Sequence, residues 1–447
     1  MEQVSLRELY ATCEGIMIYD LQRFGKSDLS QARKVEKQLL PIALTPPEVN
    51  DIVSAAADLA INSTYEPPPS YAPTGSAADT AFSGSAILEL RLTPPPAPPK
   101  SPLVVLKHST VRANSVDPSD ESKLKAAQKV DTSSINEYAY LTAYPASTLG
   151  PSVKIPETLF ARNHPTEGVT LLLESMSTWS QVPVIPLGDK LTNSLKWLAN
   201  FHASFLSPTL NPSALDPDKI TQLGGWEIGT HLSLEKRPEN EPQRLPNDIS
   251  EFAERFEEID DYFKTELARN QGNRLLAVAE DAANFLNPKD HPNRTMVHGD
   301  YKQGNFFFND SEDICVFDWQ WTGPGLGATD LIYLCAMAVS DDVVVDHETN
   351  IIKPYHNFLI EALGGDSTVY PYSTFLKEFK ISTLDYQRWQ GGSRLKSMTP
   401  ETMKKAGENV DVNHGIFRRS LERVKWIFKV VDGVLDEVES GSLNFEC

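Results

Sequence analysis

The 447-residue chain has few cysteines and no long apolar run, and both absences narrow the class of protein. Its four cysteines, Cys13, Cys315, Cys335 and Cys447, lack the spacing of a metal site or a disulfide framework. This predicts reduced thiols in a cytoplasmic protein. No apolar run reaches the roughly 18 residues needed to span a membrane, and no basic segment leads into an apolar stretch at the N-terminus. We therefore expect neither a membrane span nor a secretory signal.

Positive charge is also scarce. Lysine and arginine total 41 against 61 aspartates and glutamates, which gives a formal charge of −20. This surplus opposes binding to nucleic acid or to an anionic membrane, and it mildly favours a cationic substrate. The length is sufficient for a large buried core and predicts two or three structural units. Neither length nor composition specifies an oligomeric state.

The most informative segment contains three oxygen-bearing side chains at regular positions. Asp300 and Asn305 are five residues apart, and Asp318 follows Asn305 by thirteen. This is the spacing by which a phosphoryl-transfer enzyme supplies a base aspartate, a metal-binding asparagine and a second metal-binding carboxylate. Mg²⁺ on the phosphates of ATP requires hard oxygen ligands. We predict Asp300 as the catalytic base and Asn305 and Asp318 as ligands of Mg²⁺.

Two short apolar runs place these residues. Residues 306–308 and 314–317 favour strands, and the polar turn formers of residues 309–313 separate them. A hairpin here would hold Asn305 at its entry and Asp318 at its exit, close enough to share a metal. The alternative is that Asp300, Asn305 and Asp318 only cap turns, as such residues often do in loops.

Residues 297–334 carry a resemblance to a known family. Besides the three residues above, they contain Gly323, Gly325 and the tail Asp330-Leu331-Ile332-Tyr333-Leu334. The stretch resembles the aminoglycoside phosphotransferase and choline kinase superfamily, and within it the CHK kinase-like group that includes ecdysteroid kinase-like proteins. The resemblance implies an α+β, bilobal, protein-kinase-like fold with a small β-rich N-lobe and a larger, mainly helical C-lobe. It also implies ATP- and Mg²⁺-dependent phosphorylation of a hydroxyl group on a small molecule.

A serine/threonine protein kinase is the second hypothesis. Lys302, two residues after the base, is its best support, because protein kinases carry a lysine there near the transferring phosphate. We assign Lys302 to that catalytic role or, alternatively, to the surface. Against a protein kinase stand Gly299 in place of the arginine of the HRD triplet, Trp319-Gln320 after the metal aspartate, and the lack of an APE-type segment. A non-catalytic binding protein with a kinase fold is the third hypothesis.

The nucleotide-binding residues are predicted upstream. Residues 86–92 and 102–107 read as strands, and Lys107 ends the second, where a kinase places the lysine that contacts the α- and β-phosphates. A helix over residues 133–141 offers Glu137 as the partner that orients Lys107. Glu121 is a weaker candidate, because its surroundings are polar and typical of a loop.

The phosphate loop and the hinge are less clearly marked. No GxGxxG motif occurs, and the small residues Ser83, Gly84 and Ser85 are the candidates for contacting phosphate through backbone N–H groups. An ordinary linker is the alternative. After a strand over residues 169–173, the segment from Glu174 to Met176 resembles the hinge of the superfamily, where backbone groups contact adenine.

These elements predict three regions. Residues 1–44 form an N-terminal helical extension, residues 45–176 the N-lobe, which begins with a helix over residues 46–61, and residues 177–447 the C-lobe with the acceptor site. A proline-rich stretch at residues 95–100 joins two strands as a linker, although its PxxPxK pattern would also suit an SH3 domain.

Two helices of the C-lobe are predicted from their apolar stripes. The first, over residues 191–205, carries His202 on its buried face, where we expect a hydrogen-bonded core histidine; His298 has a similar bracing role. The second has apolar residues at three- and four-residue steps from Phe417 to Leu435. Its basic residues are expected on a solvated face; they are Arg418, Arg419, Arg423 and Lys425.

Overall fold

The computed structural model describes residues 17–20, 85–91, 103–109, 111–166, 168–289 and 291–446, which fall into two compact units. The first unit comprises Met1–Gly150, Ile155–Ser180 and Leu223–Gly225, and the second comprises the rest of the chain. The first holds a five-stranded sheet and the second is mainly helical. The predicted α+β class, with a small β-rich part and a larger helical part, is confirmed.

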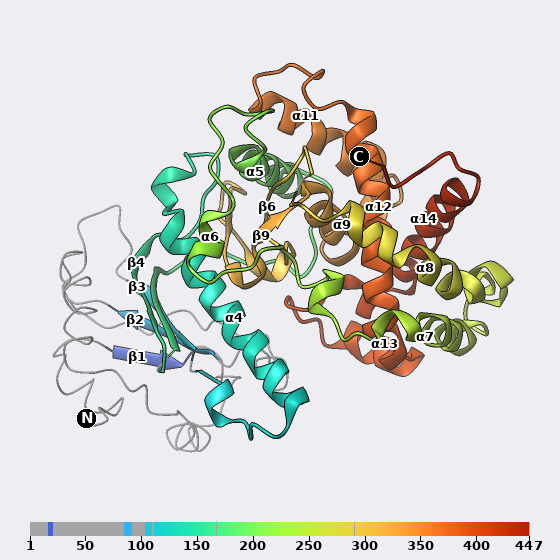
Figure 1. Ribbon diagram of the computed structural model, residues 1–447, viewed down its shortest axis with the longest axis horizontal. Helices are drawn as coiled ribbons and strands as arrows, with labels where there is room; N and C mark the ends of the chain where they lie inside the picture. Colours follow the sequence, from blue (N-terminus) through green and yellow to red (C-terminus); the bar gives the residue numbers. More distant parts are fainter. Residues whose placement is uncertain are drawn as a thin grey trace. The chain divides into compact units, whose positions relative to one another are not determined.

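The sheet of the first unit is antiparallel throughout, in the order β1-β2-β3-β5-β4. Figure 1 shows its strands side by side. The strands are β1 Met17–Asp20, β2 Ser85–Arg91, β3 Leu103–Ser109, β4 Thr158–His164 and β5 Gly168–Glu174. The strands predicted over residues 86–92, 102–107 and 169–173 are thus present. Strand β1 falls within the range predicted as a helical extension, and the rest of that range lies outside the described residues.

A long helix, α4 (Glu121–Ala143), packs against β4 and β5. It begins where Asp120 accepts a hydrogen bond from the backbone N–H of Lys123, which satisfies a donor of the first turn. The interpretation of Glu121 as a loop residue is wrong, since it is the first residue of this helix. The N-terminal half is polar because it is largely exposed, so it lacks the apolar stripe that would have marked a helix.

The second unit is built around α12 (Tyr372–Ser393), which packs against helices α7, α8, α9 and α14. Figure 1 shows α12 running between them. The predicted helix with His202 is present as α5, and its stripe is buried. The helices are α5 Asp189–Phe205, α6 Lys219–Gln222, α7 Glu241–Phe256, α8 Glu266–Phe285, α9 Gly327–Met337, α10 Asp341–Val344, α11 Lys353–Ala362, α13 Pro400–Glu408 and α14 Leu421–Glu439.

Two small antiparallel sheets lie among these helices. Strand β6 (Thr295–Val297) pairs with β9 (Gly323–Gly325), and β7 (Phe306–Phe308) pairs with β8 (Ile314–Val316). The second pair is the predicted hairpin. Short 3₁₀ turns flank these strands and the last helix, at Gln303–Asn305, Trp319–Trp321 and Ile416–Arg418.

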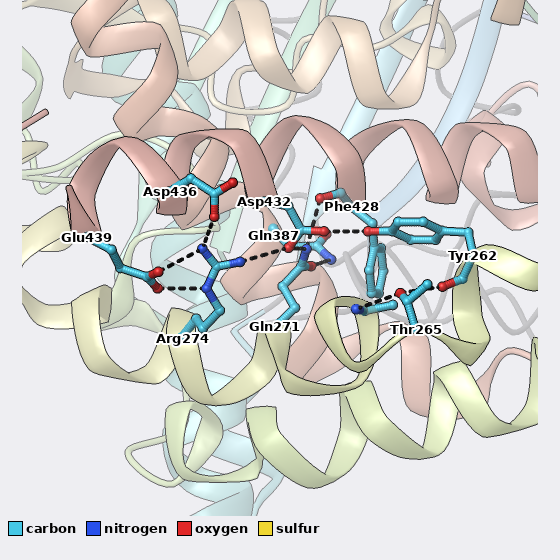
Figure 2. Close-up of polar contacts among 10 residues, drawn as sticks. Tyr262, Thr265, Gln271, Arg274, Gln387, Phe428, Asp432, Asp436 and Glu439 are labelled. Carbon is cyan, nitrogen blue, oxygen red and sulfur yellow. Dashed lines mark hydrogen bonds and ion pairs between the residues drawn. The ribbon is translucent and has the colours of Figure 1, made fainter. Parts of the chain in front are cut away.

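Helices α8, α12 and α14 are joined by a polar network (Figure 2). Asp432 on α14 accepts hydrogen bonds from Tyr262 and Gln271 and forms an ion pair with Arg274. Gln387 on α12 extends the network by donating to Gln271. We call these five residues the α14 network.

The basic residues at the start of α14 are not all on a solvated face, contrary to the sequence interpretation. Arg423 is completely buried and donates to the carbonyl groups of Cys335 and Val339, and it pairs with Asp341. It therefore satisfies acceptors at the C-terminal end of α9 that no residue of that helix can reach.

Some sequence interpretations fall outside the described residues. They concern the helix over residues 46–61, the proline-rich stretch 95–100, Cys13 and Cys447. Cys315 and Cys335 are both buried. Among the described residues, no helix combines the length and the apolar character needed to cross a membrane.

Candidate active site

The loop that carries Asp300 is held by one buried carboxylate, Asp330 on α9. Its two oxygens accept hydrogen bonds from the backbone N–H groups of His298, at 2.6 Å, and Gly299, at 2.9 Å. It also accepts from His202 Nε2 at 3.2 Å. Because a carboxylate can accept several bonds at once, Asp330 fixes the entry of the loop and ties it to α5.

Gly299 occupies a position that only glycine can fill. Its φ is +79°, and a Cβ atom there would lie 2.1 Å from the backbone oxygen of Trp321 and 2.7 Å from the backbone nitrogen of Thr230. Both the left-handed backbone and the close approach exclude a side chain. The absence of the arginine found in protein kinases therefore has a local structural cause.

His298 braces the loop, as the sequence predicts. Its Nε2 lies 3.0 Å from the carbonyl oxygen of Phe317, and its Nδ1 accepts from the backbone N–H of Asp300 at 3.3 Å. A carbonyl can only accept, so the ring proton resides on Nε2. Burial lowers the pKa of His298, which keeps the ring neutral and suits it to a bracing role. His202 is likewise buried and bonded on both ring nitrogens, to Tyr355 and Asp330.

Asp300 is buried and has one satisfied and one open oxygen. Its Oδ2 accepts from Lys302 Nζ at 2.8 Å and from Asn305 Nδ2 at 3.0 Å. No hydrogen bond of ordinary geometry from a described residue reaches Oδ1, although the Tyr333 hydroxyl group lies close enough to lower the pKa of the carboxylate. An open, buried carboxylate oxygen costs free energy unless another molecule supplies a donor.

The charge state of Asp300 suits a proton acceptor. Burial by itself raises the pKa of Asp300, but Lys302, His231 and Tyr333 outweigh it and hold the pKa below its usual value. Lys302 is therefore not simply a surface residue, because its ammonium group contacts the carboxylate. The side chain of Asp300 is a charged acceptor whose open oxygen can take a hydrogen bond from a hydroxyl group.

Asn305 and Asp318 are brought together by the hairpin. Asn305 directly precedes β7, Asp318 follows β8 by two residues, and Phe317 N–H donates to the backbone oxygen of Asn305 at 3.1 Å. The amide nitrogen of Asn305 bonds to Asp300, which leaves its Oδ1 as an oxygen donor. Asp318 has a φ of +70°. A non-glycine residue in this region stores strain of the kind found at functional sites.

This pair of oxygen donors fits the chemistry of Mg²⁺. Mg²⁺ binds carboxylate and amide oxygens, and in nucleotide sites it keeps waters and takes substrate phosphates as further ligands. Among the residues described, no group of three or more histidine, cysteine, aspartate or glutamate side chains is placed to hold a metal without such help.

In the first unit, Lys107 and Glu137 are in direct contact. Lys107 Nζ lies 2.5 Å from Glu137 Oε2, and both side chains are buried. Lys107 is on β3, between Ile87 of β2 and Leu171 of β5, and Glu137 is on α4. Glu121 instead pairs with Lys125 at the exposed start of α4. The structure thus brings together the two residues that the sequence suggested as partners.

The structure describes only some of the other residues that the sequence suggests for nucleotide binding. Ser83 and Gly84 lie outside the described residues, and Ser85 begins β2. Glu174 ends β5, where its N–H donates to the Glu157 carbonyl. Met176 is buried, and its carbonyl accepts from Trp179 N–H.

Sequence reasoning did not predict the ring contacts that extend from His231 and Tyr333, which lie near Asp300. Trp226 stacks on Trp321, with 5.6 Å between ring centroids. The ring centroid of His231 lies 5.5 Å from that of Tyr333 and 5.2 Å from that of Trp389. These residues come from four distant segments, and no local pattern links them. The bracing role of Asp330 was also missed, although an aspartate inside the apolar run of α9 is a signal for a buried polar contact.

Part of the chain is similar in sequence to a known protein family. Residues 188–365 match the ecdysteroid kinase-like family. The resemblance found in residues 297–334 is confirmed. The ecdysteroid kinase-like region includes Asp300, Asn305, Asp318 and Asp330. Comparison with curated proteins gives no match.

Three of the solved structures that are similar to this chain are described as an aminoglycoside phosphotransferase, an ethanolamine kinase and a choline kinase. A putative aminoglycoside phosphotransferase from Ralstonia eutropha is 12% identical, with 79% of this chain and 90% of that chain covered and a TM-score of 0.37. Plasmodium vivax ethanolamine kinase is 12% identical, covering 91% and 96%, with a TM-score of 0.36. Choline kinase from Cryptosporidium parvum is 10% identical, covering 81% and 89%, with a TM-score of 0.38. Similarity at this level does not specify an activity or a substrate.

Proposed function

We propose that this protein is a phosphotransferase that uses ATP and Mg²⁺ to phosphorylate a hydroxyl group of a small molecule. The observation that carries the proposal is the state of Asp300. It is a charged, buried carboxylate on a rigid loop, with one oxygen held by Lys302 and Asn305 and the other open. This is the arrangement needed to orient a hydroxyl group and accept its proton.

The other residues have supporting roles in the proposal. Asn305 and Asp318 would hold Mg²⁺, which when bound would neutralise phosphate charge. Lys302 positions Asp300 and adds positive charge beside it. In the first unit, Lys107, oriented by Glu137, would contact the α- and β-phosphates, and the Glu174–Met176 backbone would contact adenine. Residues 83–85 remain the proposed phosphate loop.

Nucleotide binding tests the proposal before any acceptor is known. We expect ATP with Mg²⁺ to raise the unfolding temperature of the protein, and Asp318→Ala to abolish the part of that shift that depends on Mg²⁺. Asp281→Ala, which removes an exposed carboxylate on α8, is the matched control and should behave as the parent. If Asp318→Ala bound Mg-ATP as tightly as the parent, the metal assignment would be wrong.

Lys107→Ala should weaken the response to ATP, and the double variant Lys107→Glu with Glu137→Lys should not restore it. Full restoration would mean that the two residues form only a structural ion pair.

A screen of ATP consumption over alcohols and protein substrates separates the alternatives. Turnover with alcohols supports the proposal, and turnover only with proteins favours a protein kinase, which the Lys302–Asp300 contact also allows. A chain that binds nucleotide but consumes none with either class would be a binding protein.

A further inference from the structure

A continuous group of rings lies beside the open oxygen of Asp300. The ring centroid of Tyr386 lies 5.5 Å from that of Trp389 and 6.1 Å from that of Tyr333. The His231 ring packs edge to face against both Tyr333 and Trp389. Trp321 lies 5.6 Å from His231. We call these five residues the aromatic cluster. A molecule whose hydroxyl group is at Asp300 would meet the apolar faces and edges of these rings.

His231 connects the cluster to the catalytic loop. Its Nδ1 lies 3.3 Å from the carbonyl oxygen of Gly299, the residue before Asp300. The carbonyl can only accept, so Nδ1 donates and Nε2 is left with a lone pair. Burial lowers the pKa of His231 to about 3, and the nearby charges of Arg394 and Lys302 act in the same direction. The ring is neutral, so it contributes apolar surface to the aromatic cluster and does not act as a second base.

A second buried polar atom in the cluster has no partner. Trp389 Nε1 makes no hydrogen bond of ordinary geometry to a described residue, and neither does Asp300 Oδ1, although the Tyr333 hydroxyl group lies close enough to the Asp300 carboxylate to lower its pKa. The indole N–H is a donor and the carboxylate oxygen is an acceptor. A molecule that satisfies both must therefore itself offer an acceptor and a donor. Each buried polar group without a partner costs desolvation free energy. Both would be satisfied by a molecule that carries a hydroxyl group and an acceptor oxygen.

Apart from the Asp300 carboxylate, two positive charges that lack an ion pair among the described residues lie next to the cluster. The guanidinium group of Arg394 lies 5.2 Å above the Trp389 ring, and Arg418, in the 3₁₀ turn before α14, is close enough to act on it electrostatically. Within the described part of the chain, neither arginine forms an ion pair, whereas the neighbouring Arg237 and Arg388 both pair with Glu241. Burial and the charge of Arg418 lower the pKa of Arg394, which means that the charged form of Arg394 is disfavoured at this position. An anion bound beside the two arginines would stabilise that charged form.

We propose that the phosphoryl acceptor is an anionic alcohol: its hydroxyl group at Asp300, its apolar body against the aromatic cluster, and its carboxylate or similar acidic group bound by Arg394 and Arg418. Arginine matches a carboxylate through paired N–H donors. A cationic alcohol would instead be repelled by both guanidinium groups. The local charge thus opposes the weak preference for a cationic substrate that the net charge of −20 suggests. This inference rests on the proposed function, because it assigns the acceptor of the same reaction.

Three probes of one shape test the charge preference. They are 4-(hydroxymethyl)benzoate, 4-methylbenzyl alcohol and 4-(aminomethyl)benzyl alcohol, which are anionic, neutral and cationic. Binding to the full chain is measured by calorimetry, with and without Mg-ADP, and phosphorylated product by mass spectrometry with Mg-ATP. We expect the anionic probe to bind about tenfold or more tightly than the neutral one, the usual scale of a charge-assisted hydrogen bond. Equal or tighter binding of the cationic probe, or no binding of the anionic one, would overturn the inference.

Variants locate the anion site. Arg394→Met and Arg418→Met should each remove most of the preference for the anionic probe while leaving binding of the neutral probe within about threefold. Lys396→Met removes an exposed charge two residues from Arg394 and should change neither. An anion preference that survives both arginine substitutions would also overturn the inference.

The readouts separate the two proposals. The Mg-ATP-dependent rise in unfolding temperature should persist in the arginine variants, which also shows that they are folded. If that rise is present and the charge preference is absent, only the anionic acceptor is wrong. If the anionic probe binds through Arg394 but no nucleotide binds, the phosphotransferase is wrong and the anion site stands.

Discussion

The second unit contains two groups of buried polar side chains that differ in how completely they are satisfied. In the α14 network, Asp432 accepts from Tyr262 and Gln271, and Arg274 reaches three carboxylates, those of Asp432, Asp436 and Glu439 (Figure 2). Around Asp300, a carboxylate oxygen and an indole N–H have no described partner, and two arginines lack an ion pair. In the α14 network the charged groups bond to each other and the open atom is a neutral amide oxygen, Gln387 Oε1, whereas at Asp300 the open atom belongs to a charged carboxylate.

This difference predicts opposite responses to substitution. A side chain of the α14 network should contribute to stability and not to binding, because all its contacts are within the fold. An open side chain at the site should contribute to binding or turnover and little to stability, since the folded protein already bears the cost of its open atoms.

The largest effect is expected at Asp300. Asp300→Asn should keep Mg-ATP binding but reduce turnover by about 10²- to 10⁴-fold, roughly 3 to 5 kcal/mol, because an amide cannot accept the proton of the hydroxyl group. Its free energy of unfolding should fall by only about 1 kcal/mol, because the Asn oxygen can still accept a hydrogen bond from Lys302 although the charge is lost. Steady-state kinetics with an identified acceptor measures the turnover rate, and urea unfolding measures the free energy of unfolding. Near-normal turnover would refute the mechanism.

Arg274 should show the reverse. Arg274→Met leaves Asp432 buried without its ion-pair partner, and we expect a loss of roughly 3 kcal/mol in the free energy of unfolding with no change in Mg-ATP binding. Asp436→Asn is the control. It removes a mostly exposed partner of the same arginine and should cost no more than about 0.5 kcal/mol. Equal losses in the two variants would show that burial does not decide the strength of these pairs.

Sequence spacing was sufficient for part of the site. The interval between Asp300 and Asn305 and the hairpin before Asp318 are local features, so they are visible in the chain itself. The contact between Lys107 and Glu137 joins residues 30 positions apart, but a strand end followed by a helix was enough to suggest it.

The rest of the site depends on tertiary packing. His231 and Trp389 lie on segments separated by more than 150 residues, and only the packing of α12 brings them together. The burial of Arg423 was missed for a similar reason. An apolar stripe assigns basic residues to solvent, whereas the carbonyl groups at the end of α9 require a donor.

The effect expected at Glu378, a third kind of buried acid on the same helix as Trp389, is no larger than that at Arg274 and depends on pH. It accepts hydrogen bonds from Asn293 and Tyr370, so its oxygens are satisfied, yet burial raises its pKa to about 7 from the ordinary 4.5. Between these two pH values the folded protein retains a proton that the unfolded chain releases. The resulting stabilisation is complete below pH 4.5 and is lost as the pH rises through about 7.

Glu378→Gln removes this titration, because an amide does not ionise in this range. Relative to the parent, the variant should gain up to about 3 kcal/mol in free energy of unfolding between pH 4.5 and pH 8, measured by urea unfolding at intervals of pH. Glu361→Gln, at an exposed position on α11, is the control and should remain parallel to the parent. Parallel curves for Glu378→Gln as well would mean that the two hydrogen bonds keep the buried carboxylate charged, and Glu378 would then resemble Asp432, the hydrogen-bonded buried acid of the α14 network.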